Sequence, residues 1–150
     1  MIVNVYSKGK YPADVLSNFA PNKFSFDGFD DIPCMEAFLQ SLKFSDVEEQ
    51  KRVLYLSAKA AKEAGTAKGW QRFLYWKGRR IDRFSKEYKA LVWGAYKELL
   101  KNTDFRKALE FSGHKLLLHT IGKTFRRKTV LTWWEFTGIL TRLRREVLSV

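Results

Sequence analysis

Apolar residues recur at helical spacing along the second half of the chain. Residues 85–101 make the longest such segment, and residues 104–111 make a shorter one that ends near Gly113. The last helix is predicted to begin at the capping box Thr132-Trp-Trp-Glu135 and to continue to Val147. The inner face of the longest segment is expected to comprise Tyr88, Leu91, Val92, Ala95 and Leu99.

The first half of the chain mixes strand and helix patterns. Residues 1–6 alternate weakly and carry β-branched side chains, which predicts a strand. Asp27-Gly28 lies between apolar flanks, a good hairpin pattern for residues 24–29. Pro33 precedes a helix that we expect over residues 34–44, with an extension to about residue 56.

Two further segments complete the pattern. Residues 57–69 are rich in Ala and Lys, and their small side chains can form a face for close helix packing. Residues 115–121 indicate a buried strand or a short apolar run. There is no internal repeat or low-complexity linker, so the sequence predicts one α+β domain over residues 1–150, mainly helical with a small β-sheet or hairpin.

Three polar residues stand out in the predicted helix at 34–44. Glu36, Gln40 and Lys43 recur at i, i+4 and i+7, so they fall within roughly 60° of one another on one helix face. Leu39 and Phe44 flank them, as in one wall of a polar pocket. The alternative is a solvated face with a Glu/Lys pair, but seven residues exceed the three or four that such pairs span.

Composition narrows the class of protein. Hydrophobic residues make up 45% of the 150 residues and aromatic residues 15%, which indicates a folded chain with room for a cleft. The single cysteine, Cys34, suits a reducing compartment. No signal peptide or long apolar run is visible, so we expect a cytoplasmic protein without a membrane partner.

The formal charge of +12 is unevenly distributed. Residues 1–50 contain 4 Lys or Arg and 8 Asp or Glu, whereas residues 51–150 contain 24 and 8. This excess predicts a surface that attracts a polyanion or a phosphorylated ligand.

One segment combines bases and aromatic side chains. Within residues 70–80, Trp70, Phe73, Tyr75 and Trp76 alternate with basic residues, a composition that suits stacked bases and phosphates. The alternative is a core-facing aromatic segment with solvated charges. Our candidates for contact with phosphate or nucleic acid are Arg79, Arg80, Arg83, Arg126 and Arg127.

The sequence lacks the motifs of several common binding and catalytic sites. There is no Walker loop and no dinucleotide glycine fingerprint. One Cys with His114 and His119 does not make the usual zinc site, so we expect neither a metal nor a cofactor. Glu36 and Lys43 remain as the candidates for catalysis.

The order of the motifs resembles the NADAR (YbiA-like) superfamily. The specific match is Leu16-Ser-Asn-Phe19, then Phe24 and Asp27-Gly28, then Pro33-x-x-Glu36-x-x-x-Gln40-x-x-Lys43-Phe44. Weaker matches are Ala61, Lys62 and Gly65, and Thr137-Gly-Ile-Leu140 followed by Arg142 and Arg144.

The resemblance implies a YbiA-like fold and cleavage of an N-glycosidic bond to a ribosyl group. Known members remove ADP-ribose from guanine bases in nucleic acid or hydrolyse phosphorylated intermediates of riboflavin synthesis. Glu36 and Lys43 correspond to the paired motif residues and are the expected catalytic residues. The expected substrate-binding residues are Ser17, Asn18, Phe19, Gln40, Trp76 and His119.

The chain departs from the family pattern in three places. Phe84 stands where a Trp is frequent, and His119 stands where a Glu is frequent. Residues 121–128 replace an acidic Asp and a Trp-Gly pair. These differences bear on the substrate more than on the reaction class. His119 itself suits either the core or the pocket, and Phe19 suits either packing or stacking on a base.

Two routes to bond cleavage are open. Glu36 can stabilise the positive charge that develops at the anomeric carbon, or activate water as a general base. Alternatively, a desolvated Lys43 can attack that carbon and form a Schiff base with the opened sugar. The pairing of both residues in the motif favours the lysine route.

The sequence thus predicts an N-glycosidase that removes ADP-ribose from guanine bases of nucleic acid or nucleotides. The alternative within this class is an N-glycosidase that acts on phosphorylated riboflavin-pathway intermediates. The alternative from another class is a non-catalytic protein that binds nucleic acid or ADP-ribose.

Overall fold

The computed structural model describes residues 1–149. The helices are α1 (Ala13–Leu16), α2 (Met35–Ser41), α3 (Val47–Leu54), α4 (Ala58–Lys68), α5 (Lys86–Leu99), α6 (Thr103–Phe111) and α7 (Trp133–Leu148). The strands form three pairs, namely β1 (Ile2–Asn4) with β6 (Leu116–Leu118), β2 (Phe24–Phe26) with β3 (Phe29–Ile32), and β4 (Phe73–Trp76) with β5 (Arg79–Asp82). The predicted class, a mainly helical α+β domain with small β elements, is confirmed.

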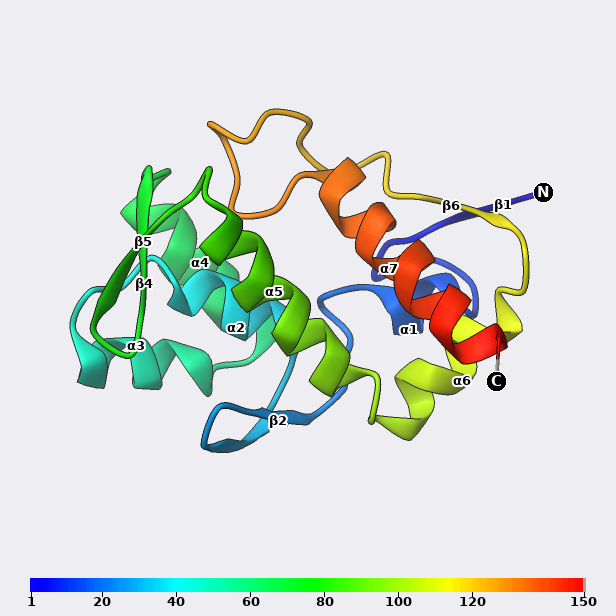
Figure 1. Cartoon of the computed structure of the whole chain (residues 1–150), viewed down its shortest axis with the longest axis horizontal. Helices are drawn as coiled ribbons and strands as arrows, with labels where there is room; N and C mark the ends of the chain where they lie inside the picture. Colours follow the sequence, from blue (N-terminus) through cyan, green and yellow to red (C-terminus); the bar gives the residue numbers. More distant parts are fainter. Residues whose placement is uncertain (150) are drawn as a thin grey trace.

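Two groups of elements meet along α5 (Figure 1). On one side α2 packs against α3 and α4, beside the β4–β5 hairpin. On the other side α6 and α7 pack together with α1 and the β1–β6 pair. Helix α5 contacts both α2 and α7 and so joins the two groups. None of the helices in residues 1–149 is long and apolar enough to cross a membrane.

Most helices begin where a polar side chain caps them. At the starts of α4, α5 and α6, the side chains of Ser57, Ser85 and Asn102 each accept one hydrogen bond from the backbone N–H three residues further along the chain. Thr132 and Glu135 form the predicted capping box of α7. The two predicted strands at 1–6 and 115–121 are also present, and they pair in parallel as β1 and β6.

The helix predicted to run from 34 to about 56 is interrupted. Helix α2 ends at Ser41, and α3 begins only after Asp46, whose side chain accepts a hydrogen bond from the Glu49 amide at 2.9 Å. The buried Gln50 amide donates to the carbonyl oxygens of Ser41 and Phe44, so it satisfies groups that a continuous helix would use itself. The prediction of one helix was wrong because periodicity does not reveal a buried amide cap.

The aromatic segment at 70–80 forms a hairpin that the sequence did not predict. The turn between β4 and β5 has positive φ angles at Lys77 and Gly78 (53° and 84°). Trp76 points into the core, where its Nε1 donates to Asp27 Oδ2 at 2.7 Å. Its ring packs against Phe26 and Phe38. The assignment of Trp76 to substrate binding is therefore wrong, because the indole is buried beneath the β2–β3 turn.

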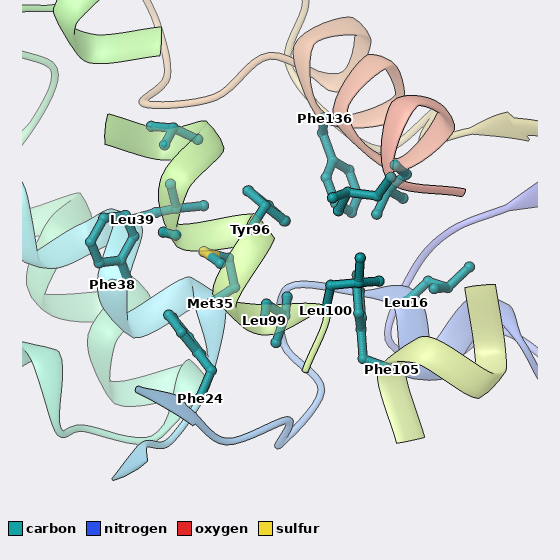
Figure 2. Close-up of a cluster of buried hydrophobic side chains, with 14 of the residues drawn as sticks. Leu16, Phe24, Met35, Phe38, Leu39, Tyr96, Leu99, Leu100, Phe105 and Phe136 are labelled. Atoms are coloured by element: carbon teal, nitrogen blue, oxygen red, sulfur yellow. The ribbon is translucent and has the colours of Figure 1, made fainter. Parts of the chain in front are cut away.

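The core brings together both ends of the chain. Figure 2 shows Leu16 from α1, Met35 and Phe38 from α2, and Phe136 from α7 converging on the α5 side chains. Tyr96 of α5 belongs to this cluster and is fully buried, although the sequence placed Leu91 on the inner face instead. Leu91 is only partly buried, because the face of α5 is rotated towards Tyr96.

Arg83 follows β5 and is buried, with its side chain 1% exposed. Its guanidinium donates to both carboxylate oxygens of Glu135 at 3.1 and 2.6 Å and to the Thr129 carbonyl at 3.0 Å. These bonds tie the end of the β4–β5 hairpin to the start of α7. The assignment of Arg83 to phosphate contact is therefore wrong, since its donors are used inside the protein.

We predict that Arg83→Met lowers the free energy of unfolding by about 3–5 kcal/mol, because it leaves the Glu135 carboxylate buried without its partner. Arg79→Met is the matched control, since it removes an ion pair with Glu87 in which the Arg79 side chain is 73% exposed. Such a pair contributes at most about 1 kcal/mol. Urea unfolding measures the free energy of unfolding of both variants, and an equal loss in the two would contradict the structural role of Arg83.

Candidate active site

A cleft of about 300 Å³ lies between α2, α4, the loop after α1 and the loop before α7. It brings together residues from positions 7 to 131 of the chain. The predicted site residues that line it are Ser17, Asn18, Phe19, Glu36, Gln40, Lys43 and His119. The residues chosen from the first motif therefore share one cavity.

Glu36 lies in the first turn of α2. Its backbone N–H donates to the Asn18 carbonyl at 3.0 Å, which joins the helix to the loop after α1. Burial raises the pKa of the Glu36 carboxyl above its usual value. The hydrogen bond from Gln40 and the positive charges of Lys62 and Lys43 partly oppose this rise. The cleft thus holds a poorly solvated carboxyl group with cations nearby.

Gln40 holds Glu36 from one turn further along α2. Its Nε2 donates to Glu36 Oε2 at 2.9 Å. Its Oε1 is buried and has no hydrogen-bond partner within residues 1–149. A buried carbonyl oxygen without a donor is costly, and this one lies against Gly65 of α4.

Lys43 lies in the turn after α2 and not on the helix itself. Its Nζ donates to the Gly65 carbonyl at 2.9 Å, and its side chain is largely buried. Burial lowers the pKa of the Lys43 amine, the charge of Lys123 lowers it further, and the Glu36 carboxylate opposes both. A lowered pKa increases the fraction of neutral amine, which is the nucleophilic form.

Gly65 lets α4 approach α2 closely. A Cβ atom at this position would lie 1.7 Å from Gln40 Oε1 and 2.6 Å from its Cδ. No ordinary side chain fits there without displacing Gln40. The glycine of the weaker NADAR motif therefore has a physical reason in this chain, which is contact with the polar residues of α2.

The loop after α1 is held by two side-chain bonds. Ser17 Oγ accepts from the Phe19 amide at 3.1 Å, which shapes the loop. The Tyr96 hydroxyl donates to Asn18 Oδ1 at 2.5 Å. Burial raises the pKa of Tyr96 well above 10, so the hydroxyl stays a donor and the Asn18 amide N–H groups remain for the cleft. Tyr96 is a site residue that the sequence did not predict, because the apolar pattern placed Leu91 and not Tyr96 on the inner face of α5.

His119 lies at the start of the loop before α7 and combines both expected roles. Its Nδ1 is 2.5 Å from the Val5 carbonyl oxygen, and its ring packs edge-on against Phe136. It also lines the cleft. A Cβ atom at Gly122 would lie 2.5 Å from the His119 ring, so the loop passes tightly over it. His119 therefore anchors the loop that closes one side of the cleft.

Three further lysines line the cleft and were not among the predicted site residues. Lys62 comes from α4, while Lys123 and Lys128 come from the loop before α7. Lys62 Nζ lies 5.4 Å from the centroid of the Phe19 ring. With Lys43, four lysines face a single carboxylate, Glu36, among the described residues that line the cleft. This balance suits an anionic ligand.

The remaining predicted phosphate contacts lie outside the cleft. Arg79 pairs with Glu87 on the surface, and Arg80 lies 4.5 Å from the ring of Phe73. Arg126 and Arg127 border a separate cavity next to the cleft. Within residues 1–149, no group of three or more His, Cys, Asp or Glu side chains is placed to hold a metal ion.

Comparison with solved structures supports the predicted fold. The chain is similar to the Escherichia coli protein YbiA, whose NMR structure matches with a TM-score of 0.69 over 99% of this chain and 86% of the other. The sequence identity is 18%, so the match establishes the YbiA-like fold alone.

Comparison with known sequences identifies the family. The chain is 37% identical over 147 residues to the uncharacterized 17.1 kDa protein in the Gp30-rIII intergenic region of Enterobacteria phage T4, covering 95% of this chain and 96% of the relative. A family model described as bacteriophage protein GP30.3 matches residues 10–145. The chain, with its YbiA-like fold, therefore belongs to the bacteriophage GP30.3 family.

Proposed function

We propose that this protein is an N-glycosidase that hydrolyses a ribosyl C–N bond, with ADP-ribose on guanine bases of nucleic acid or nucleotides as substrate. The observation that carries the proposal is the partly buried Glu36 carboxyl, held by Gln40 and accompanied by Lys43 in one cleft. The YbiA-like fold and the order of the motifs support the same reaction class.

The reaction needs charge stabilisation at one carbon atom. Cleavage of the C–N bond leaves the electron pair on the base and positive charge on the anomeric carbon. An ionised Glu36 in a poorly solvated cleft stabilises that charge more strongly than it would in water. Gln40 orients the carboxylate through its Nε2 hydrogen bond.

Lys43 offers the second route. Its neutral amine attacks the anomeric carbon, the base departs with the bonding electrons and takes up a proton, and the ring opens to an imine. Water then hydrolyses the imine and releases the sugar and the free amine. The lowered pKa of Lys43 and its hydrogen bond to the Gly65 carbonyl, which orients Nζ, favour this route.

The charge of the cleft supports a phosphorylated substrate. Lys62, Lys123 and Lys128 lie along it in addition to Lys43. ADP-ribose carries two phosphate groups, whereas a riboflavin-pathway ribosylamine phosphate carries one. The excess of lysines therefore favours ADP-ribose, and an activity screen on guanine-ADP-ribosylated DNA and RNA beside ribosylamine phosphates compares the two directly.

We predict that Glu36→Gln lowers turnover by about 10²–10⁴-fold, the usual contribution of a positioned general base. The same variant should be as stable as the native protein at pH 7, or more so. A folded-state pKa above the unfolded value means that ionising Glu36 costs stability as pH rises through that pKa. Thermal unfolding and a base-release assay measure the two effects.

Glu48→Gln is the control for this variant, because Glu48 is exposed at the start of α3. It should change neither turnover nor the unfolding temperature. A Glu36→Gln protein with full activity would remove Glu36 from the reaction. No base release by the native protein would remove the glycosidase proposal and favour non-catalytic binding of nucleic acid or ADP-ribose.

We predict that borohydride traps a sugar adduct on Lys43 during turnover, because the imine of the lysine route is reducible. Mass spectrometry of the peptide that contains Lys43 detects the adduct, which should persist in Lys62→Ala and disappear in Lys43→Ala. If no adduct forms and Lys43→Ala keeps normal activity, the lysine route is wrong and Glu36 acts with water alone.

We predict that activity falls on the acidic side as Glu36 takes up a proton, at a pH above the usual range of a glutamate. Lys62→Gln removes a positive charge that lowers the Glu36 pKa, so the acidic limb of kcat/KM should move to higher pH. Lys86→Gln, on the exposed first turn of α5, is the control and should leave the limb in place. A limb that stays fixed or moves to lower pH in Lys62→Gln would contradict the assignment of Glu36.

A further inference from the structure

A row of alternating guanidinium groups and aromatic rings runs from the β4–β5 hairpin to the loop before α7. We call it the cation–aromatic row, and its members are Arg80, Phe73, Arg72, Phe84, Arg126 and Arg127. Neighbouring members lie between 4.5 and 5.8 Å apart, measured from guanidinium carbon to ring centroid. Such distances are those of cation–π contacts.

Arg72 links the two halves of the row. Its guanidinium carbon lies 5.8 Å from the Phe73 ring and 5.3 Å from the Phe84 ring. On the loop side, Arg126 and Arg127 lie 5.0 and 5.8 Å from the same Phe84 ring. Phe84 is therefore the centre of the row, and it stands where the NADAR pattern has a Trp.

The row continues into the candidate active site. A cavity of about 620 Å³ is lined by Phe84, Phe125, Arg126, Arg127 and Lys128, so its lining is entirely aromatic and cationic. Lys128 also lines the cleft that contains Glu36. A ligand can therefore extend from the cleft onto the row without leaving positively charged surface.

The loop that carries this end of the row is held by tryptophans. Trp70 Nε1 donates to the Arg126 carbonyl at 2.8 Å, and the Trp70 ring lies 6.2 Å from Phe84. Trp134 Nε1 donates to the Thr124 carbonyl at 2.9 Å. These bonds fix the backbone of the loop while its basic side chains stay on the surface, so the positive charges are placed before a ligand arrives.

The positive charges on the loop are not neutralised within the protein. Arg72 pairs with Asp82, but within the described part of the chain Arg126, Arg127 and Lys128 have no carboxylate within 4.0 Å. Three guanidinium groups surround the ring of Phe84, and like charges at such distances repel one another. A polyanion that lies across the row relieves this repulsion.

We propose that the cation–aromatic row binds single-stranded nucleic acid next to the cleft. Unpaired bases stack on Phe84, Phe125 and the guanidinium planes, and backbone phosphates pair with Arg126 and Arg127. A duplex hides its base faces, so the aromatic members of the row favour a single strand. Delivery of a modified nucleotide of this strand to Glu36 rests on the proposed function.

Fluorescence anisotropy with an unmodified labelled oligonucleotide of about 12 nucleotides tests the binding, over a series of salt concentrations. Arg126→Gln/Arg127→Gln should weaken binding and reduce the slope of log Kobs against log salt by about 1.4, the effect of two lost phosphate contacts on a single strand. The matched control is Lys51→Gln/Arg52→Gln, which removes the same charge from α3, far from the loop in Figure 1. The control should keep the native slope.

Phe84→Leu and Phe125→Leu should each weaken binding of the single-stranded oligonucleotide by about 5-fold or more, as expected for one lost base stack. Phe111→Leu is their control, because Phe111 is exposed on α6 and lies outside the row. Equal losses in the control and row variants would overturn the proposal. So would binding to the matched duplex as tight as to the single strand, or binding to phosphatidylglycerol vesicles with no binding to the oligonucleotide.

The unmodified oligonucleotide carries no ADP-ribose and so lacks the bond that the proposed function cleaves, which makes this test independent of turnover. Glu36→Gln should bind it as tightly as the native protein does. Tight binding without any hydrolysis of ADP-ribosylated substrates would remove the proposed function alone. Hydrolysis that is unaffected by the row variants, together with no oligonucleotide binding, would remove this inference alone.

Discussion

The close contact of α4 with α2 at Gly65 is the constraint on which the rest of the site depends. A Cβ atom there would overlap Gln40, and the Gly65 carbonyl accepts the hydrogen bond from Lys43. One glycine thus sets the positions of two polar side chains, and Gln40 in turn holds Glu36. The contact joins two packed helices, so the polar side chains are positioned by α2 and α4 together.

Burial gives the polar group its chemical character. Desolvation raises the pKa of Glu36 and lowers that of Lys43, so each residue is brought closer to the pH at which proton transfer is efficient. The two charges also stabilise one another, which limits both shifts. Lys62 and Lys123 add positive charge around the pair. The same arrangement that costs folding energy therefore leaves an excess of positive charge in the cleft, which suits the anionic sugar substrate that we propose.

Sequence reasoning failed where a side chain could serve either the core or the surface. Trp76 and Arg83 both lie in the aromatic and basic part of the chain, and both are buried in the structure. Trp76 donates a hydrogen bond to Asp27 in the β2–β3 turn, and Arg83 donates to Glu135 on α7. Those partners are 49 and 52 residues away, and no local pattern shows such pairs. Three of the four lysines that line the cleft, Lys62, Lys123 and Lys128, were missed for the same reason.

The sequence by itself determined the class of fold, the start of α7 and the grouping of Glu36, Gln40 and Lys43, because periodicity, capping and short spacings act between neighbours in the chain. Only the tertiary structure decided what surrounds these residues. In the structure α2 ends before Lys43, and the loop before α7 lines the cleft. Burial and long-range partners depend on packing between distant segments, and they are what turn three polar residues into a candidate site.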